Sequence, residues 1–184
     1  MIVPGTYDVY YSWDSSDPAP TQLVPRNSNA LLQAGVTVAD KLTLNLDIPT
    51  VMVTGQATVA GQRVSSTYGV LTLEAPSGDS VFLGRTGMST YSRLVIPGSY
   101  NVIYSWDSSD PAPSQLVPRN SGARIQSGLA LAGGGTPVKV DVDIPTVTVS
   151  GKITVAGKAV SSTYGVITVQ GVGSTDSAYL GRTG

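Results

Sequence analysis

The chain has 184 residues, with 11 basic and 12 acidic side chains and neither cysteine nor histidine. This balanced charge gives no reason to expect nucleic acid or an anionic membrane surface as a partner. The missing thiols and imidazoles exclude disulfides, thiolate nucleophiles, histidine bases and structural zinc, so any chemistry would depend on carboxylates and oxygen ligands. No run of about 18 apolar residues occurs, so we expect no membrane insertion.

The beginning of the chain returns almost unchanged in its second half. Residues 2–20, which contain Pro-Gly-Thr-Tyr and Trp-Asp-Ser-Ser-Asp-Pro, match residues 95–113. The correspondence continues as far as Gly184, which matches Gly87, with only small insertions at turns. A tandem repeat of this kind, with units of roughly 90 to 95 residues, points to a modular binding or building protein.

The first part of each repeat alternates with a period of two, which predicts a β-strand. The two copies agree on one face of this strand and vary more on the other. The agreeing face is therefore predicted to face the core, and it consists of Tyr7, Val9, Tyr11 and Trp13 in copy one and of Tyr100, Val102, Tyr104 and Trp106 in copy two.

The clearest alternation in the chain lies in residues 42–48, where apolar and polar side chains take turns. Copy two repeats it in residues 138–144. One dry and one wet face indicate an antiparallel strand of a sandwich, with the dry face central to the core. After Pro49 and Pro145 the alternation resumes in residues 51–59 and 147–155.

Further short strands are predicted at residues 70–73, 81–83 and 91–96, and tight turns at Ala60-Gly61 and Ala156-Gly157. Apolar residues nowhere recur at helical spacing over a useful length. The sequence therefore predicts an all-β chain of tandem antiparallel β-sandwich modules.

The order of these signals resembles the carboxypeptidase regulatory-like and CnaB-type family. The resemblance depends on Val-x-Gly-x-x-Thr-Val from Val51, on Leu-Gly-Arg-Thr-Gly from Leu83, and on Pro-Gly-Ser-Tyr-Asn-Val from Pro97. It covers residues 50–104 and implies an Ig-like or transthyretin-like sandwich of about seven strands. Modules of this family serve as accessory, stalk or adhesive modules of secreted and cell-surface proteins. Family members often contain a Lys to Asn or Asp cross-link, but the first-strand position here is Gln56 in one copy and Lys152 in the other.

The loop after each conserved tryptophan is the best candidate site. It places two carboxylates and two hydroxyls within a few residues, an oxygen set suited to Ca²⁺, and the candidate ligands are Asp14, Asp17, Asp107 and Asp110. Asp and Ser before Pro also form ordinary turns, and we expect a turn without metal. A tryptophan on the surface could stack on a sugar ring, but both continue the core face, so we expect Trp13 and Trp106 to be mostly buried.

Four arginines in the shared motifs, Arg26, Arg85, Arg119 and Arg182, could bind carboxylates of a partner or lie in solvated loops. No catalytic constellation is present, because the serines have no base and the carboxylates are not paired across a core. We therefore expect no enzyme activity and no cofactor.

The repeat can be divided in two ways. In the phase of the resembling family, residues 48–143 form a complete module, residues 1–47 the C-terminal half of another, and residues 144–184 the N-terminal half of a third. The alternative takes residues 2–87 and 95–184 as two permuted modules.

The leading hypothesis is a structural protein of an extracellular fibre or surface stalk. It would form a homo-oligomer or filament through strand edges, by complementation of half-modules. The alternative is a glycan- or Ca²⁺-binding accessory module of a secreted enzyme or adhesin. Both hypotheses place the protein outside the cell or on its surface.

Overall fold

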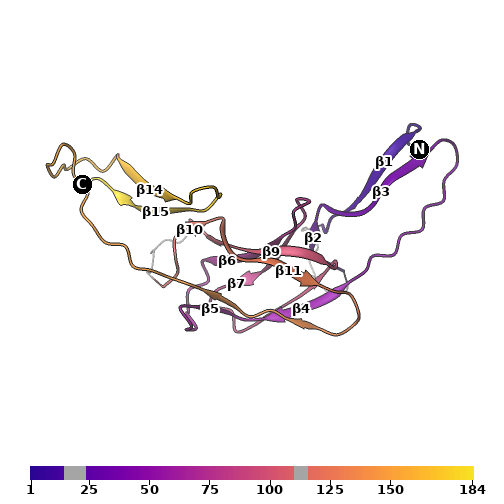
Figure 1. Ribbon diagram of the computed structural model, residues 1–184, viewed down its shortest axis with the longest axis horizontal. Coiled ribbons are helices and arrows are strands. Elements are labelled where there is room, and N and C mark those ends of the chain that lie inside the picture. Colours follow the sequence, from indigo (N-terminus) through magenta and orange to yellow (C-terminus); the bar gives the residue numbers. More distant parts are fainter. Residues whose placement is uncertain (15–23, 110–115) are drawn as a thin grey trace.

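The structure is a computed structural model that describes residues 1–14, 24–109 and 116–184. All regular elements in these ranges are β-strands and none is a helix, so the all-β expectation is confirmed. It follows that these ranges contain no helix capable of spanning a membrane. Figure 1 shows a central body with an arm at each end, the N-terminal arm in indigo and the C-terminal arm in yellow.

The central body is a β-sandwich, and its larger sheet has the strand order β11-β9-β6-β7-β2. Neighbouring strands in this sheet are all antiparallel. The strands are β2 (Asn27–Ser28), β6 (Gly69–Glu74), β7 (Ser80–Arg85), β9 (Gly98–Trp106) and β11 (Ala123–Leu131).

The opposite layer is built around the continuous segment 51–59, which forms β4 (Val51–Gly55) and β5 (Ala57–Val59). β8 (Tyr91–Val95) pairs antiparallel with β4. β12 (Val138–Lys139) and β13 (Val142–Ile144) pair with β4 and β5 in parallel. The predicted antiparallel direction of residues 138–144 is therefore wrong, because alternation reports which face is buried and says nothing about strand direction.

The core lies between these layers and follows the predicted alternation. Val51, Val53, Leu71, Leu73 and Tyr104 are all 2% exposed or less. Burial of such side chains contributes roughly 1.5 to 3 kcal/mol each to folding. This dry interface holds the two layers together.

The predicted tight turns at Ala60-Gly61 and Ala156-Gly157 are confirmed. Ala60 and Gly61 both have positive φ, 49° and 75°. Residues with this backbone conformation match the right-handed twist of the flanking strands of a hairpin. Val59 and Gln62 accordingly exchange backbone hydrogen bonds across the turn.

Each arm contains a smaller sheet. In the N-terminal arm, β1 (Gly5–Tyr11) pairs antiparallel with β3 (Ala30–Val38). In the C-terminal arm, the strand order is β10-β15-β14, made of β10 (Asn120–Ser121), β14 (Val166–Gln170) and β15 (Ser177–Arg182). β1 and β14 are edge strands, whereas their sequence equivalents β9 and β6 pair with each other inside the central sheet.

Residues 42–48 form no strand in this chain, contrary to the prediction. Leu42, Leu44 and Leu46 are 48%, 39% and 45% exposed, so their dry face does not lie in a core. The equivalent residues Val140 and Val142 are 5% and 4% exposed, because they pack beside the segment 51–59. The same alternating pattern becomes a buried strand only where a partner segment is available.

Candidate interaction surface

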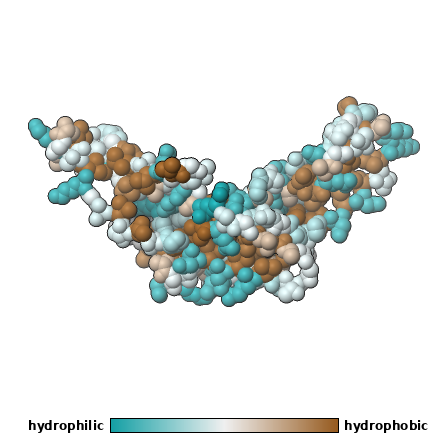
Figure 2. Space-filling model, viewed as in Figure 1, coloured by the Kyte–Doolittle hydropathy of each residue, from teal (hydrophilic) through white to brown (hydrophobic). Residues whose placement is uncertain are grey.

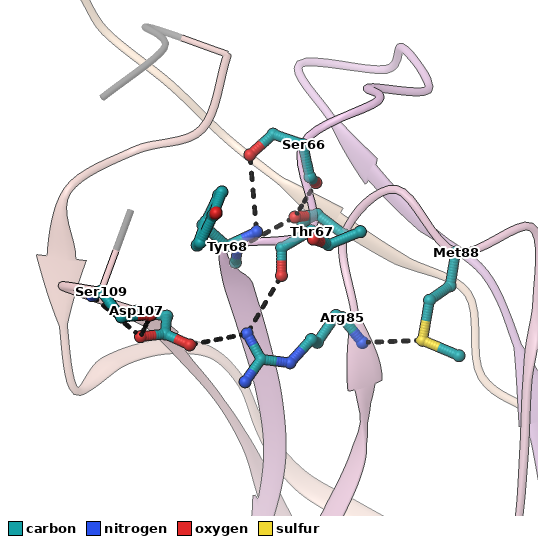
Figure 3. Close-up of polar contacts among 9 residues, drawn as sticks. Ser66, Thr67, Tyr68, Arg85, Met88, Asp107 and Ser109 are labelled. Carbon is teal, nitrogen blue, oxygen red and sulfur yellow. Dashed lines mark hydrogen bonds and ion pairs between the residues drawn. The ribbon is translucent and has the colours of Figure 1, made fainter. Parts of the chain in front are cut away.

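In the candidate calcium loop of copy two, Asp107 forms an ion pair with Arg85 (Figure 3). The Arg85 guanidinium donates to Asp107 at 2.8 Å and to the Thr67 carbonyl at 3.1 Å. The hydroxyl and backbone N–H of Ser109 donate to the other carboxylate oxygen of Asp107. These hydrogen bonds from Ser109 and Arg85 lower the pKa of Asp107 to about 2. The Asp107 carboxylate therefore stabilises a turn and links that turn to β7.

Of the other candidate calcium ligands, the structure describes only Asp14, which is exposed and follows the first arm strand. Asp17 and Asp110 lie outside the described residues. Within the described ranges, no group of three or more acidic side chains is close enough to hold a metal ion. The structure thus assembles no oxygen cage from the residues that it describes.

Trp13 and Trp106, which recur in the two copies, are both mostly buried, as the sequence predicts, and an arginine lies over each ring. Arg26 lies over Trp13 at 4.7 Å from the ring centroid, and Arg119 lies over Trp106 at 5.5 Å. Guanidinium groups stack on aromatic faces in this way when the ring lies at the edge of a core. Arg182 instead donates to the Thr163 carbonyl, just as Arg85 donates to that of Thr67.

The C-terminal arm exposes the residues that correspond to one layer of the central core. Val147 and Val149 are 89% and 67% exposed, whereas their equivalents Val51 and Val53 are almost completely buried. The same holds for β14, where Val169 is 48% exposed and its equivalent Leu73 is fully buried. Figure 2 shows brown, hydrophobic residues along both arms as well as in the central body.

The N-terminal arm exposes the complementary layer. Tyr7 is 38% exposed, while its equivalent Tyr100 is 2% exposed in the central sandwich. The three leucines of residues 42–48 add a second apolar row to this arm. Where exposed apolar side chains form a contiguous patch, such a surface is uncommon on a monomer and is typical of interaction sites.

An open groove of about 680 Å³ lies between the C-terminal arm and the central body. Its walls combine apolar residues of both parts, among them Val59, Leu116, Val147, Val149 and Val169. The corresponding residues of the central sandwich, Val51, Val53 and Leu73, belong to its buried core. The groove therefore exposes side chains whose equivalents are buried in the central sandwich.

Gly55 shows how closely that layer approaches. A Cβ atom on Gly55 would lie 1.8 Å from the carbonyl oxygen of Val140. The equivalent Gly151 has no atom within 4 Å of the same position. Both glycines belong to the Val-x-Gly motif, but in this chain only Gly55 has a neighbouring strand.

A buried polar cluster joins the N-terminal arm to the central body. Asn27 is fully buried, and its side-chain amide donates to Asp79 at 2.5 Å and to the Tyr100 hydroxyl at 3.0 Å. Its carbonyl oxygen accepts from the backbone N–H of Ile96 at 2.8 Å. The Tyr100 hydroxyl also lies 3.0 Å from Asp79 and 2.8 Å from the Ile96 carbonyl.

Burial raises the pKa of Asp79 and the pKa of Tyr100, although hydrogen bonds from Asn27 oppose both shifts. The tyrosine therefore remains protonated and can donate. Sequence reasoning missed this cluster because Asn and Asp are common in turns. The available signal was that the Pro-Arg-Asn-Ser motif and the aspartate occur in both copies, as Asn27 with Asp79 and Asn120 with Asp176.

No protein-family model, curated protein or solved structure matches this chain.

Proposed function

We propose that this protein is a structural repeat protein of an extracellular fibre or surface stalk, in which copies of the chain assemble head to tail. One observation carries the proposal: the two arms expose the positions that the central sandwich buries, and each arm holds the strands that the other lacks. The occupant of each arm is therefore the opposite arm of a second copy.

The central sandwich is the template for this contact. In it, β6 pairs with β9, and residues 51–59 pair with residues 138–144. By equivalence, β14 of one copy pairs with β1 of the next, and residues 147–155 receive residues 42–48 of the next copy. Addition of a strand to an exposed edge satisfies its backbone groups and covers an aggregation-prone surface.

This assembly favours the division into a complete module at residues 48–143 flanked by half-modules at residues 1–47 and 144–184. Val140, Val142 and Ile144 belong to the core of the central body and lie beside residues 51–59. The permuted modules 2–87 and 95–184 would separate these residues from their partners. We infer tandem transthyretin-like modules from this arrangement and from the resemblance of the motifs.

Hydrophobic burial supplies the driving force. Each Val or Leu side chain that passes from solvent into a core contributes roughly 1.5 to 3 kcal/mol, before the cost of association. Because the two surfaces are different, the contact is heterologous and extends into a filament. A filament of sandwich modules suits a stalk, and the resemblance of the motifs supports a location outside the cell or on its surface.

A ligand-binding accessory module for glycan or Ca²⁺ is the alternative function. The covered tryptophan rings and the Arg85–Asp107 ion pair give it less support than the exposed arms give assembly. Calorimetric titration with Ca²⁺ distinguishes the two, because a site tighter than millimolar would favour the alternative.

Two blocked variants test the assembly. Leu44→Asp places a charge on the N-terminal arm, and Val149→Asp places one on the C-terminal arm. Both sites are exposed in the single chain, so the central sandwich should still melt as in the parent. Sedimentation velocity should show each variant alone as a monomer and an equimolar mixture as a 1:1 complex that does not grow.

The matched control is Val140→Asp, the equivalent of Leu44→Asp inside the central sandwich. Val140 is 5% exposed, so an unpaired charge there should unfold the sandwich. Continued polymerisation of either blocked variant, or a mixture that stays monomeric, would contradict head-to-tail assembly.

A further inference from the structure

The C-terminal arm contains half of the buried polar cluster. Asn120, the equivalent of Asn27, donates its side-chain amide to Asp176 at 2.9 Å. β10 and β15 pair in the register of β2 and β7, with Asn120 opposite Ala178 as Asn27 is opposite Val81. Asn120 and Asp176 are only partly buried, and the positions of Tyr100 and Ile96 have no counterpart beside them in the described part of this chain.

The N-terminal arm contains the other half. The Tyr7 hydroxyl donates to the Val3 carbonyl at 2.5 Å, just as the Tyr100 hydroxyl contacts the Ile96 carbonyl at 2.8 Å. The Tyr7 hydroxyl thus contacts the carbonyl of Val3 as the Tyr100 hydroxyl contacts that of Ile96, the equivalent residue. Both half-sites exist before the arms meet.

We propose that Asn120 and Asp176 of one copy form a buried hydrogen-bonded lock with Tyr7 and Val3 of the next copy. The inference rests on the proposed assembly and specifies its register. Two apolar surfaces can pack in more than one register. A buried amide and carboxylate, in contrast, lose their hydrogen bonds in any register but one. The lock therefore selects the one alignment in which the tyrosine hydroxyl reaches Asp176.

A double-mutant cycle between the two blocked chains tests the lock. Tyr7→Phe is introduced into the Val149→Asp chain, which offers only its N-terminal arm. Asp176→Ala is introduced into the Leu44→Asp chain, which offers only its C-terminal arm. Calorimetry on the 1:1 complexes should show that each change alone raises Kd about tenfold. The two changes together should raise Kd by less than the product of their separate effects.

Tyr11→Phe is the matched control, because the Tyr11 hydroxyl donates to the Pro25 carbonyl of its own arm. Its effect should multiply with that of Asp176→Ala, without coupling. Tyr100→Phe calibrates the cluster within one chain and should lower the melting temperature of the central sandwich.

The possible results separate the lock from the assembly itself. A complex in which Tyr7→Phe changes Kd by less than twofold, or multiplies with Asp176→Ala, would overturn the lock and leave the assembly intact. Absence of any complex between the two blocked parents would overturn the proposed function and the lock with it.

Discussion

At the scale of single residues, the Asp107 carboxylate illustrates how a motif that suits a cation serves a structural turn. Ser109 and Arg85 hold its pKa at about 2, below the ordinary value of 3.8. A carboxyl whose pKa is lowered in the folded state stabilises that state above its unfolded pKa. This contribution is lost as pH falls from about 4 towards 2.

The first prediction concerns this titration. Ser109→Ala and Arg85→Ala should each raise the pKa of Asp107 towards 3.8, because each removes a donor to the ionised carboxylate. A ¹³C NMR titration of the side-chain carboxyl measures the midpoint directly. A midpoint near 4 in the parent protein would contradict the hydrogen bonds described for this loop.

Residue types explain why the sequence predicts the apolar core but not the polar cluster. Val51, Val53, Ala57 and Val59 fall at alternate positions of their segment, and the period of two identifies their buried face directly. Asn27 has no such pattern, since its role depends on Asp79 and Tyr100, which are distant in sequence. Only the three-dimensional pairing of β2 with β7 brings these side chains together.

At the scale of elements, the segments 42–48 and 138–144 show that a segment forms a strand only when another segment pairs with it. Both alternate in the same way, yet only the second forms β12 and β13, beside residues 51–59. Backbone groups of a strand need a neighbour to bond with, and local sequence cannot report whether one is present. The apolar pattern predicted the buried face of residues 138–144 correctly, whereas the same prediction for residues 42–48 is wrong.

The second prediction uses the two glycines of the Val-x-Gly motif. Gly55→Ala should cost about 3 kcal/mol or more, because its Cβ would overlap the Val140 carbonyl. Gly151→Ala should leave thermal unfolding of the central sandwich unchanged and weaken assembly, because the strand of the next copy would meet the same methyl group. Calorimetric melts of dilute protein and sedimentation of concentrated protein separate the two effects. Equal loss of stability in both variants would show that Gly151 is already packed within its own chain.

At the scale of the whole molecule, the chain consists of a central body with an arm on each side (Figure 1). The tandem repeat in the sequence predicts that equivalent segments share a fold. It does not predict which segments are buried, because burial depends on whether the complementary layer belongs to the same chain. Val147 and Val149 on one arm and Leu44 and Leu46 on the other are therefore exposed, although their equivalents in the central body are buried.

The most direct test of head-to-tail assembly is the mass of the unmodified chain as a function of concentration. Light scattering coupled to size exclusion should show a monomer of 18.9 kDa only at high dilution. With rising concentration the mass should increase through successive multiples without reaching a fixed oligomer, since the two ends differ and the contact does not close. A monomer that persists at all concentrations, with both arms protected from proteolysis, would contradict the account.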